Sequence, residues 1–267
     1  MTNGLYAQAL KNLVTHRKNA AEKPFAQEIR AADGNPSARW TCETLYAAFG
    51  PQGWWPVAEP GGTAEYKRGR NSRQLSENQR FEVAVGSILA QNTSWNNAAK
   101  AVENLRQAKL VNAARLTRAN VGGLAELMRP SGYYRQKAAR LKTLAAFWVE
   151  NTGFEKLETA VMRRKLLELN GVGPETADSI LLYAFGRPVF VVDAYTRRIF
   201  GRTGVCRLER GDEGIVRIAG EAGFSLMELA EFHALLVQLA KKHCLKRNPA
   251  CTGCPLATAC RFARNPE

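Results

Sequence analysis

A short glycine-rich stretch in the middle of the chain, Leu-Asn-Gly-Val-Gly-Pro at 169–174, constrains the fold more than any other feature. Gly171 and Gly173 permit backbone conformations that other residues avoid, and Pro174 suits the first position of a helix, where no backbone N–H is needed. The stretch therefore predicts a tight hairpin between two helices. Its free N–H groups and the helix dipole favour an anion, so Gly171, Val172 and Gly173 are candidate contacts to a phosphate. A turn that binds nothing is the alternative.

Apolar residues elsewhere in the chain recur mostly at helical spacing, without a convincing run of alternating strands. The clearest stripes lie at 141–148 and 226–237, and a shorter helix is expected at 43–49. The segment 81–91 is apolar on every side, which predicts a helix inside a core. The valine-rich segment 188–193 is short enough to be a buried connection. The sequence therefore predicts an all-α protein.

The charge of the chain points to a polyanionic partner. The formal net charge is +14, which favours nucleic acid before a membrane surface, with an ordinary basic soluble protein as the alternative. The first residues lack an apolar segment typical of export signals, and no eighteen apolar residues follow one another. We therefore expect a cytoplasmic protein, associated with the nucleoid if its partner is DNA.

Four cysteines with the spacing C-x6-C-x2-C-x5-C lie near the end of the chain: Cys244, Cys251, Cys254 and Cys260. Their segment is too short for a hydrophobic core, so a bound group must hold it together. A [4Fe-4S] cluster is favoured over zinc, because structural zinc usually draws on two close cysteine pairs and only one occurs here. Lys246 and Arg247 would then face a phosphate backbone. Cys42 and Cys206 are expected to be buried thiols.

Together, the hairpin, the Val-Val-Asp that follows it and the cysteine spacing resemble the helix-hairpin-helix DNA glycosylases of the endonuclease III superfamily, over about residues 41–261. The resemblance implies two helical lobes with a DNA-binding cleft between them. It also implies a monomer that removes a damaged base, flipped out of double-stranded DNA, in base excision repair. The expected segments are an N-terminal appendage at 1–40, part of the cluster lobe at 41–80, the central lobe at 81–193 and the remaining cluster lobe at 194–267.

The resemblance maps a catalytic aspartate onto Asp193, which would stabilise positive charge at C1′ of the sugar or activate a water. Asp193 also fits the N-cap of a helix beginning at Ala194, and both roles can hold. Bifunctional members carry a lysine at the second residue after the Gly-Val-Gly, where its amine cleaves the strand through a Schiff base. Glu175 occupies that position, which predicts a monofunctional enzyme that leaves an abasic site. Lys165 is a nearby substitute that the spacing does not support.

Two stretches, Gly-Trp-Trp-Pro at 53–56 and Ile-Leu-Ala-Gln-Asn-Thr-Ser-Trp at 88–95, resemble the 3-methyladenine DNA glycosylase III branch. Trp54 and Trp55 are expected to stack on an alkylated purine, whose positive charge favours aromatic faces. Ordinary core tryptophans are the alternative. Removal of an oxidised pyrimidine, uracil or a mismatched base by the same aspartate also remains open, as does a lesion-binding cluster protein without turnover.

Two further residues align with side chains that enter the duplex. Gln91 would fill the gap left by the flipped base and Tyr133 would wedge the opposite strand. A helix-end glutamine and a packed tyrosine are the structural alternatives, and His233 is expected to be a core histidine. The chain departs from the family in a basic insertion with Lys67, Arg68, Arg70 and Arg73, which is expected to add phosphate affinity.

Overall fold

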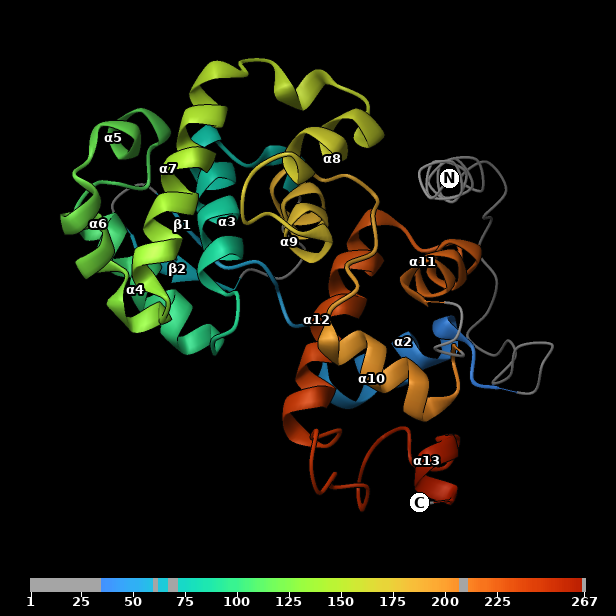
Figure 1. The fold of residues 1–267 in the computed structure, drawn as a ribbon. Helices are drawn as coiled ribbons and strands as arrows, with labels where there is room; N and C mark the ends of the chain where they lie inside the picture. The colour runs from blue at the N-terminus through green and yellow to red at the C-terminus, as the bar shows by residue number, and fades with distance from the viewer. Residues whose placement is uncertain (1–34, 60–61, 67–71, 207–210, 266–267) are drawn as a thin grey trace. The chain divides into compact units, whose positions relative to one another are not determined.

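The computed structural model describes residues 35–59, 62–66, 72–206 and 211–265. These residues fall into two compact units (Figure 1). The terminal unit comprises the described parts of Met1–Trp54 and Pro188–Glu267, and the central unit comprises those of Trp55–Arg187. Most of the expected N-terminal appendage lies outside the described residues, as do Lys67, Arg68, Arg70 and the side chain of Arg73.

The terminal unit is built from helices around an aromatic core. They are α2 (Ala38–Phe49), α10 (Ala194–Thr203), α11 (Gly211–Glu221), α12 (Leu226–Lys242) and α13 (Arg261–Arg264). Helix α12 packs against α2 and α10 (Figure 1). Phe232 of α12 lies 5.5 Å from Phe190 and 5.2 Å from Phe224, measured between ring centroids. Phe190 belongs to the valine-rich connection, which has no regular structure and is buried as expected.

The central unit carries the hairpin. Its helices are α3 (Glu77–Leu89), α4 (Trp95–Gln107), α5 (Ala113–Arg118), α6 (Val121–Leu127), α7 (Tyr134–Glu150), α8 (Thr159–Leu167) and α9 (Pro174–Ser179). Short turns η2 (Ser72–Gln74), η3 (Arg129–Ser131) and η4 (Phe154–Lys156) join them, and α9 continues as the π-helix η5 (Ile180–Ala184). Helix α3 lies between α7 and α9 (Figure 1). Every residue from Phe81 to Leu89 is buried, which confirms the predicted core helix.

Three features of the fold differ from the sequence-based expectations. A small antiparallel sheet pairs β1 (Val57–Ala58) with β2 (Ala64–Glu65). Strands of two residues are too short to show the alternation of apolar and polar residues by which a strand is predicted. Helix α2 begins at Ala38 rather than 43, because Ser37 caps it through the backbone N–H of Trp40. The first unit boundary falls at residue 54 rather than 80, since β1 packs against α3, and the second at 187 rather than 193.

Within the described part of the chain, no helix is both long enough and apolar enough to cross a membrane. Helices dominate the described residues of both units, and the small β1–β2 sheet is the exception.

Candidate functional site

The glycine-rich stretch forms the predicted hairpin between α8 and α9. Gly171 has φ +86°, and a Cβ added there would lie 2.3 Å from Cδ of Arg140, so a larger residue meets both strain and a clash. Gly173 has φ −90° at the N-cap of α9, and a Cβ there would meet nothing within 4 Å. The first glycine is thus required by the fold, whereas the second leaves open space in front of the helix start.

Gln91 lies directly against this hairpin. Its Nε2 donates to the carbonyl of Gly171 at 2.8 Å and to Oγ1 of Thr176 at 2.9 Å. Its Oε1 accepts from Nη1 of Arg140 at 2.7 Å. The side-chain amide therefore has three partners within the central unit, and it would have to leave them to enter a duplex. Sequence reasoning did not identify Arg140, because nothing near it in the chain marks it.

Tyr133 precedes α7 in a left-handed conformation, with φ 46° and ψ 29°. Its side chain is 67% exposed, which excludes the packed core tyrosine that was the structural alternative. Left-handed geometry is uncommon for a residue with a Cβ, and such outliers often accompany function. The strained backbone thus presents a large aromatic side chain to solvent.

Glu175 is exposed in the first turn of α9, where a carboxylate complements the positive end of the helix. Lys165, the residue considered as a substitute amine, lies in the last turn of α8 and is half-buried. The position at which bifunctional relatives of the resembled family carry their amine therefore holds an acid here.

Asp193 caps the N-terminus of α10 and is 7% exposed. Its Oδ1 accepts from the backbone N–H of Thr196 at 2.6 Å, and its Oδ2 lies 3.7 Å from Nε2 of His233 on α12. Burial by itself raises the pKa of Asp193, but His233 and Thr196 together outweigh burial, so the pKa lies below its ordinary value. The carboxylate is therefore buried and ionised at neutral pH. The histidine that was expected to be a plain core residue faces it.

Helix α12 also fixes the turn that leads into Trp54. The carboxylate of Glu231 accepts from the backbone N–H groups of Gln52 and Gly53, and burial raises its pKa. Trp54 itself is half-buried in the terminal unit. One helix thus supports both Asp193, through His233, and the turn before Trp54. The sequence did not indicate a role for Glu231, because its hydrogen-bond partners lie far away in the chain.

Trp55 belongs to the central unit and is 7% exposed. Its ring centroid lies 5.0 Å from that of Trp95 in an edge-on arrangement and 5.4 Å from that of Tyr183. Trp55 and Trp95 line a cavity of about 340 Å³ together with Tyr66 of the segment after β2. Trp95 ends the stretch 88–95, and the sequence predicted no role for it. Its place beside Trp55 makes it a candidate pocket residue.

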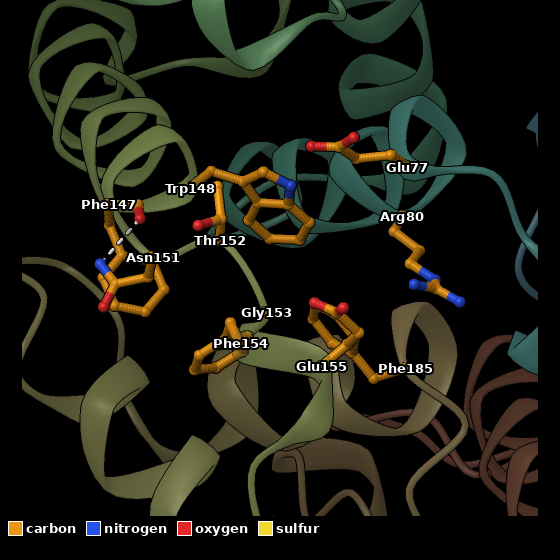
Figure 2. Close-up of a pocket in the computed structure, with 10 residues that line it drawn as sticks. All are labelled: Glu77, Arg80, Phe147, Trp148, Asn151, Thr152, Gly153, Phe154, Glu155 and Phe185. Atoms are coloured by element: carbon orange, nitrogen blue, oxygen red, sulfur yellow. Dashed lines mark hydrogen bonds between the residues drawn. The ribbon is translucent and has the colours of Figure 1, made fainter.

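A second cavity in the central unit, of about 200 Å³, lies between the start of α3, the end of α7 and η4. Figure 2 shows Trp148, Phe154 and Phe185 around it, with Glu77 and Arg80 on the α3 side. The aromatic rings also pack against one another, with Trp148 and Phe185 5.4 Å apart. None of the site residues predicted from the sequence lines this cavity, which takes no part in the candidate site.

The four cysteines of the C-terminal segment line one small cavity in the terminal unit: Cys244, Cys251, Cys254 and Cys260. None of the four forms a disulfide within the described residues, and burial raises the pKa of the Cys254 and Cys260 thiols. Among the residues that the structure describes, no three His, Cys, Asp or Glu side chains are already arranged as a metal site. A donor set made only of sulfur nevertheless suits an iron–sulfur cluster or zinc and not magnesium or calcium.

The loop between the first two cysteines is held from α10. Nε of Arg198 donates to the carbonyl of Cys244 at 2.9 Å, and Arg202 donates to the carbonyls of Leu245 at 2.6 Å and Lys246 at 3.1 Å. The side chains of Lys246 and Arg247 are exposed. Two arginines thus fix the backbone from which both cations project. The sequence indicated the cations but not the arginines that fix their loop.

Two helices joined by a glycine hairpin, with a buried aspartate capping a helix twenty residues further on, define a helix-hairpin-helix protein. A family model for HhH-GPD superfamily base excision DNA repair proteins matches residues 85–219. The chain belongs to this superfamily and is a DNA glycosylase of base excision repair.

Individual relatives agree with this assignment. A Methanocaldococcus jannaschii protein named as a candidate DNA repair glycosylase is 40% identical over 219 residues, which cover 79% of this chain and 90% of the relative. Endonuclease III of Thermotoga maritima is 29% identical over 198 residues, covering 73% of this chain and 89% of the relative.

Solved structures show the same fold. The 3-methyladenine DNA glycosylase of H. pylori, bound to 1,N6-ethenoadenine, matches with a TM-score of 0.61 and 27% identity, covering 77% of this chain and 98% of that chain. A covalent endonuclease III–DNA intermediate matches with a TM-score of 0.66 and 22% identity, covering 85% of this chain and 95% of that chain. The second likeness concerns the fold alone.

Proposed function

We propose that the protein is a monofunctional DNA glycosylase that hydrolyses the N-glycosidic bond of an alkylated purine flipped out of double-stranded DNA, leaving an abasic site. The observation that carries the proposal is Asp193, a buried carboxylate kept ionised by Thr196 and His233. The DNA-binding cleft between the two lobes, action as a monomer and a cytoplasmic location form part of this proposal.

Asp193 has the properties that the reaction needs. As the glycosidic bond breaks, the base leaves with the bonding electrons and positive charge builds at C1′ of the sugar. A fixed carboxylate stabilises that charge, and it can accept the proton of the water that adds to C1′. Because Oδ1 is held by the N–H of Thr196, the carboxylate cannot rotate freely. An alkylated purine is already cationic and leaves as a neutral base, so a strong general acid is not required.

Glu175 supports the monofunctional part of the proposal. Strand cleavage by bifunctional enzymes requires an amine that forms an imine with C1′, and a carboxylate cannot form this bond. The exposed acid at the start of α9 instead complements the helix dipole. The protein is therefore proposed to release the base and to leave the strand intact.

The aromatic residues support a purine as the released base. Trp54 and Trp55 are the proposed stacking residues, and Trp95 joins them because it lines the same cavity as Trp55. Cation–π stacking contributes about 0.5–2 kcal/mol in favour of a positively charged base over a normal one. The likeness to a 3-methyladenine DNA glycosylase that holds a modified adenine agrees with this choice.

DNA contacts are proposed at four places. The hairpin Gly171, Val172 and Gly173 binds a backbone phosphate, Lys246 and Arg247 bind a second segment of backbone, and Gln91 and Tyr133 enter the duplex. The basic insertion adds further phosphate contacts. A net charge of +14 is consistent with a polyanionic partner.

A [4Fe-4S] cluster is proposed at Cys244, Cys251, Cys254 and Cys260, where it would supply a structural crosslink that holds the loop of Lys246 and Arg247. Cys254→Ser is expected to abolish the brown absorbance of the purified protein and to lower its melting temperature, because the bound group replaces a hydrophobic core in this segment. Absorption spectra and iron and sulfide analysis measure this. A colourless wild-type protein with one zinc per chain would contradict the cluster.

Single-turnover base release tests the function. Duplexes carry 3-methyladenine, thymine glycol, uracil or a mismatch, and each reaction is read with and without subsequent alkali. We expect release from the alkylated duplex, with strand breaks only after alkali. Breaks without alkali would contradict the monofunctional proposal. Preference for thymine glycol would instead support an activity like that of the endonuclease III relatives, and no release from any duplex would leave a lesion-binding protein.

A further inference from the structure

Lys137 is a buried cation that the proposed mechanism does not use. It lies in the first turn of α7 with 1% of its surface exposed. Its ammonium donates to the carbonyl of Leu89 at 2.9 Å and to the carbonyl of Ser131 at 2.7 Å. Among the described residues, no carboxylate lies within ion-pairing distance of it. Burial lowers its pKa to about 8, so the site holds an ammonium at some cost.

The two carbonyls connect separate parts of the central unit. Leu89 is the last residue of α3, where carbonyls have no partner within the helix, and Ser131 is the last residue of η3. Each lies two residues before a side chain proposed to enter DNA. Gln91 comes two residues after Leu89, and Tyr133 comes two residues after Ser131. A single ammonium thus ties together the backbones that carry both side chains.

We propose that Lys137 is a positioning residue that sets the spacing between Gln91 and Tyr133, so that both can enter the duplex at one base pair. The proposal rests on the proposed function, because it assumes that these two side chains offset the cost of base flipping. An apolar residue of similar length would fill the same space without burying a charge. Only a donor such as this ammonium can bind the two carbonyls, which an apolar residue would leave without a partner.

The surrounding contacts support this reading. Gln91 continues from the end of α3 to the hairpin through its bond with Gly171. On the other side, Oγ of Ser131 donates to the carbonyl of Met128 at 2.8 Å, which fixes the turn before Tyr133. Lys137 binds the backbone shortly before each of the two side chains, so it is a direct contact through which the position of one constrains the other.

The test compares two duplexes that differ only in the cost of flipping. One carries 3-methyladenine opposite thymine, and the other carries it opposite an abasic-site analogue, so that no base pair has to be broken. Lys137→Met is expected to slow single-turnover release about 10- to 100-fold on the paired duplex and less than about 3-fold on the unpaired one, because flipping a paired base costs a few kcal/mol. Equal loss on both duplexes, or no loss, would overturn the proposal.

Lys142 provides a matched control on the same helix. Its ammonium also binds main-chain carbonyls, those of Leu116, Thr117 and Ala119 around the end of α5, away from Gln91 and Tyr133. Lys142→Met is therefore expected to affect the two duplexes equally, whatever its effect on stability. Should Lys137→Met fail to fold, Lys137→Gln, whose amide can still donate to one carbonyl, takes its place with the same expected direction.

Affinity separates failure of this proposal from failure of the proposed function. The dissociation constants of both duplexes are measured with the wild-type protein and with each variant. If the wild type releases no base from either duplex, the proposed function fails. The ratio of the two dissociation constants then still measures how well Gln91 and Tyr133 enter the duplex. A ratio that Lys137→Met leaves unchanged would overturn the positioning role.

Discussion

Asp193→Asn is expected to slow single-turnover base release by about 10²- to 10⁴-fold while the fold stays intact. Asparagine caps helices about as well as aspartate, so the N-terminus of α10 keeps its hydrogen bond from Thr196. The amide, however, carries no charge to stabilise the sugar cation and accepts a proton from water poorly. The measurement is the rate of base release, with the melting temperature recorded beside it.

A substitution at His233 tests the catalytic role of Asp193 without removing its side chain from the N-cap of α10. Because His233 lowers the pKa of Asp193, His233→Gln should raise that pKa toward its ordinary value. The carboxylate of the variant is then protonated at a higher pH than in the wild type. The acid limb of the pH–rate profile therefore shifts to higher pH. An Asp193→Asn protein that folds and releases base at the wild-type rate would show that Asp193 only caps the helix.

The sequence predicted those parts of the site that depend on neighbouring residues. Two glycines and a proline predict a hairpin because each acts on its own backbone, and Asp193 before Ala194 predicts a cap for the same reason. The close spacing of the four cysteines likewise predicts that they lie together, and they line one cavity. In each case the physical cause lies within a few residues, so the pattern can be read without the fold.

Contacts between distant parts of the chain could not be predicted in this way. The amide of Gln91 bonds to Gly171, eighty residues away, and the carboxylate of Glu231 accepts from the backbone N–H group of Gln52. Lys137 looks like any surface lysine in the sequence but is buried. These contacts depend on which helix faces pack together, which a single sequence leaves open. The unit boundary at residue 54 was missed for the same reason, because β1 joins the central unit only through packing on α3.

Gly171→Ala and Gly173→Ala are expected to separate the structural from the DNA-binding role of the hairpin. At Gly171, left-handed backbone costs a residue with a Cβ about 1–3 kcal/mol. The new methyl also displaces Arg140, which breaks a hydrogen bond to Gln91 worth about 1 kcal/mol. We expect a loss of roughly 3 kcal/mol in unfolding free energy, or a fall of about 10 °C in melting temperature.

Gly173→Ala is expected to fold nearly as well as the wild type. Its φ of −90° is ordinary for alanine and its Cβ meets nothing within 4 Å, so only the weaker N-cap matters, at about 1 kcal/mol. If a phosphate lies against the start of α9, however, the methyl group occupies the space that the phosphate needs. Duplex affinity should then fall about tenfold, and the salt dependence of binding should lose about one unit of slope. Wild-type affinity and slope in a folded Gly173→Ala protein would show that the hairpin joins α8 to α9 without binding DNA.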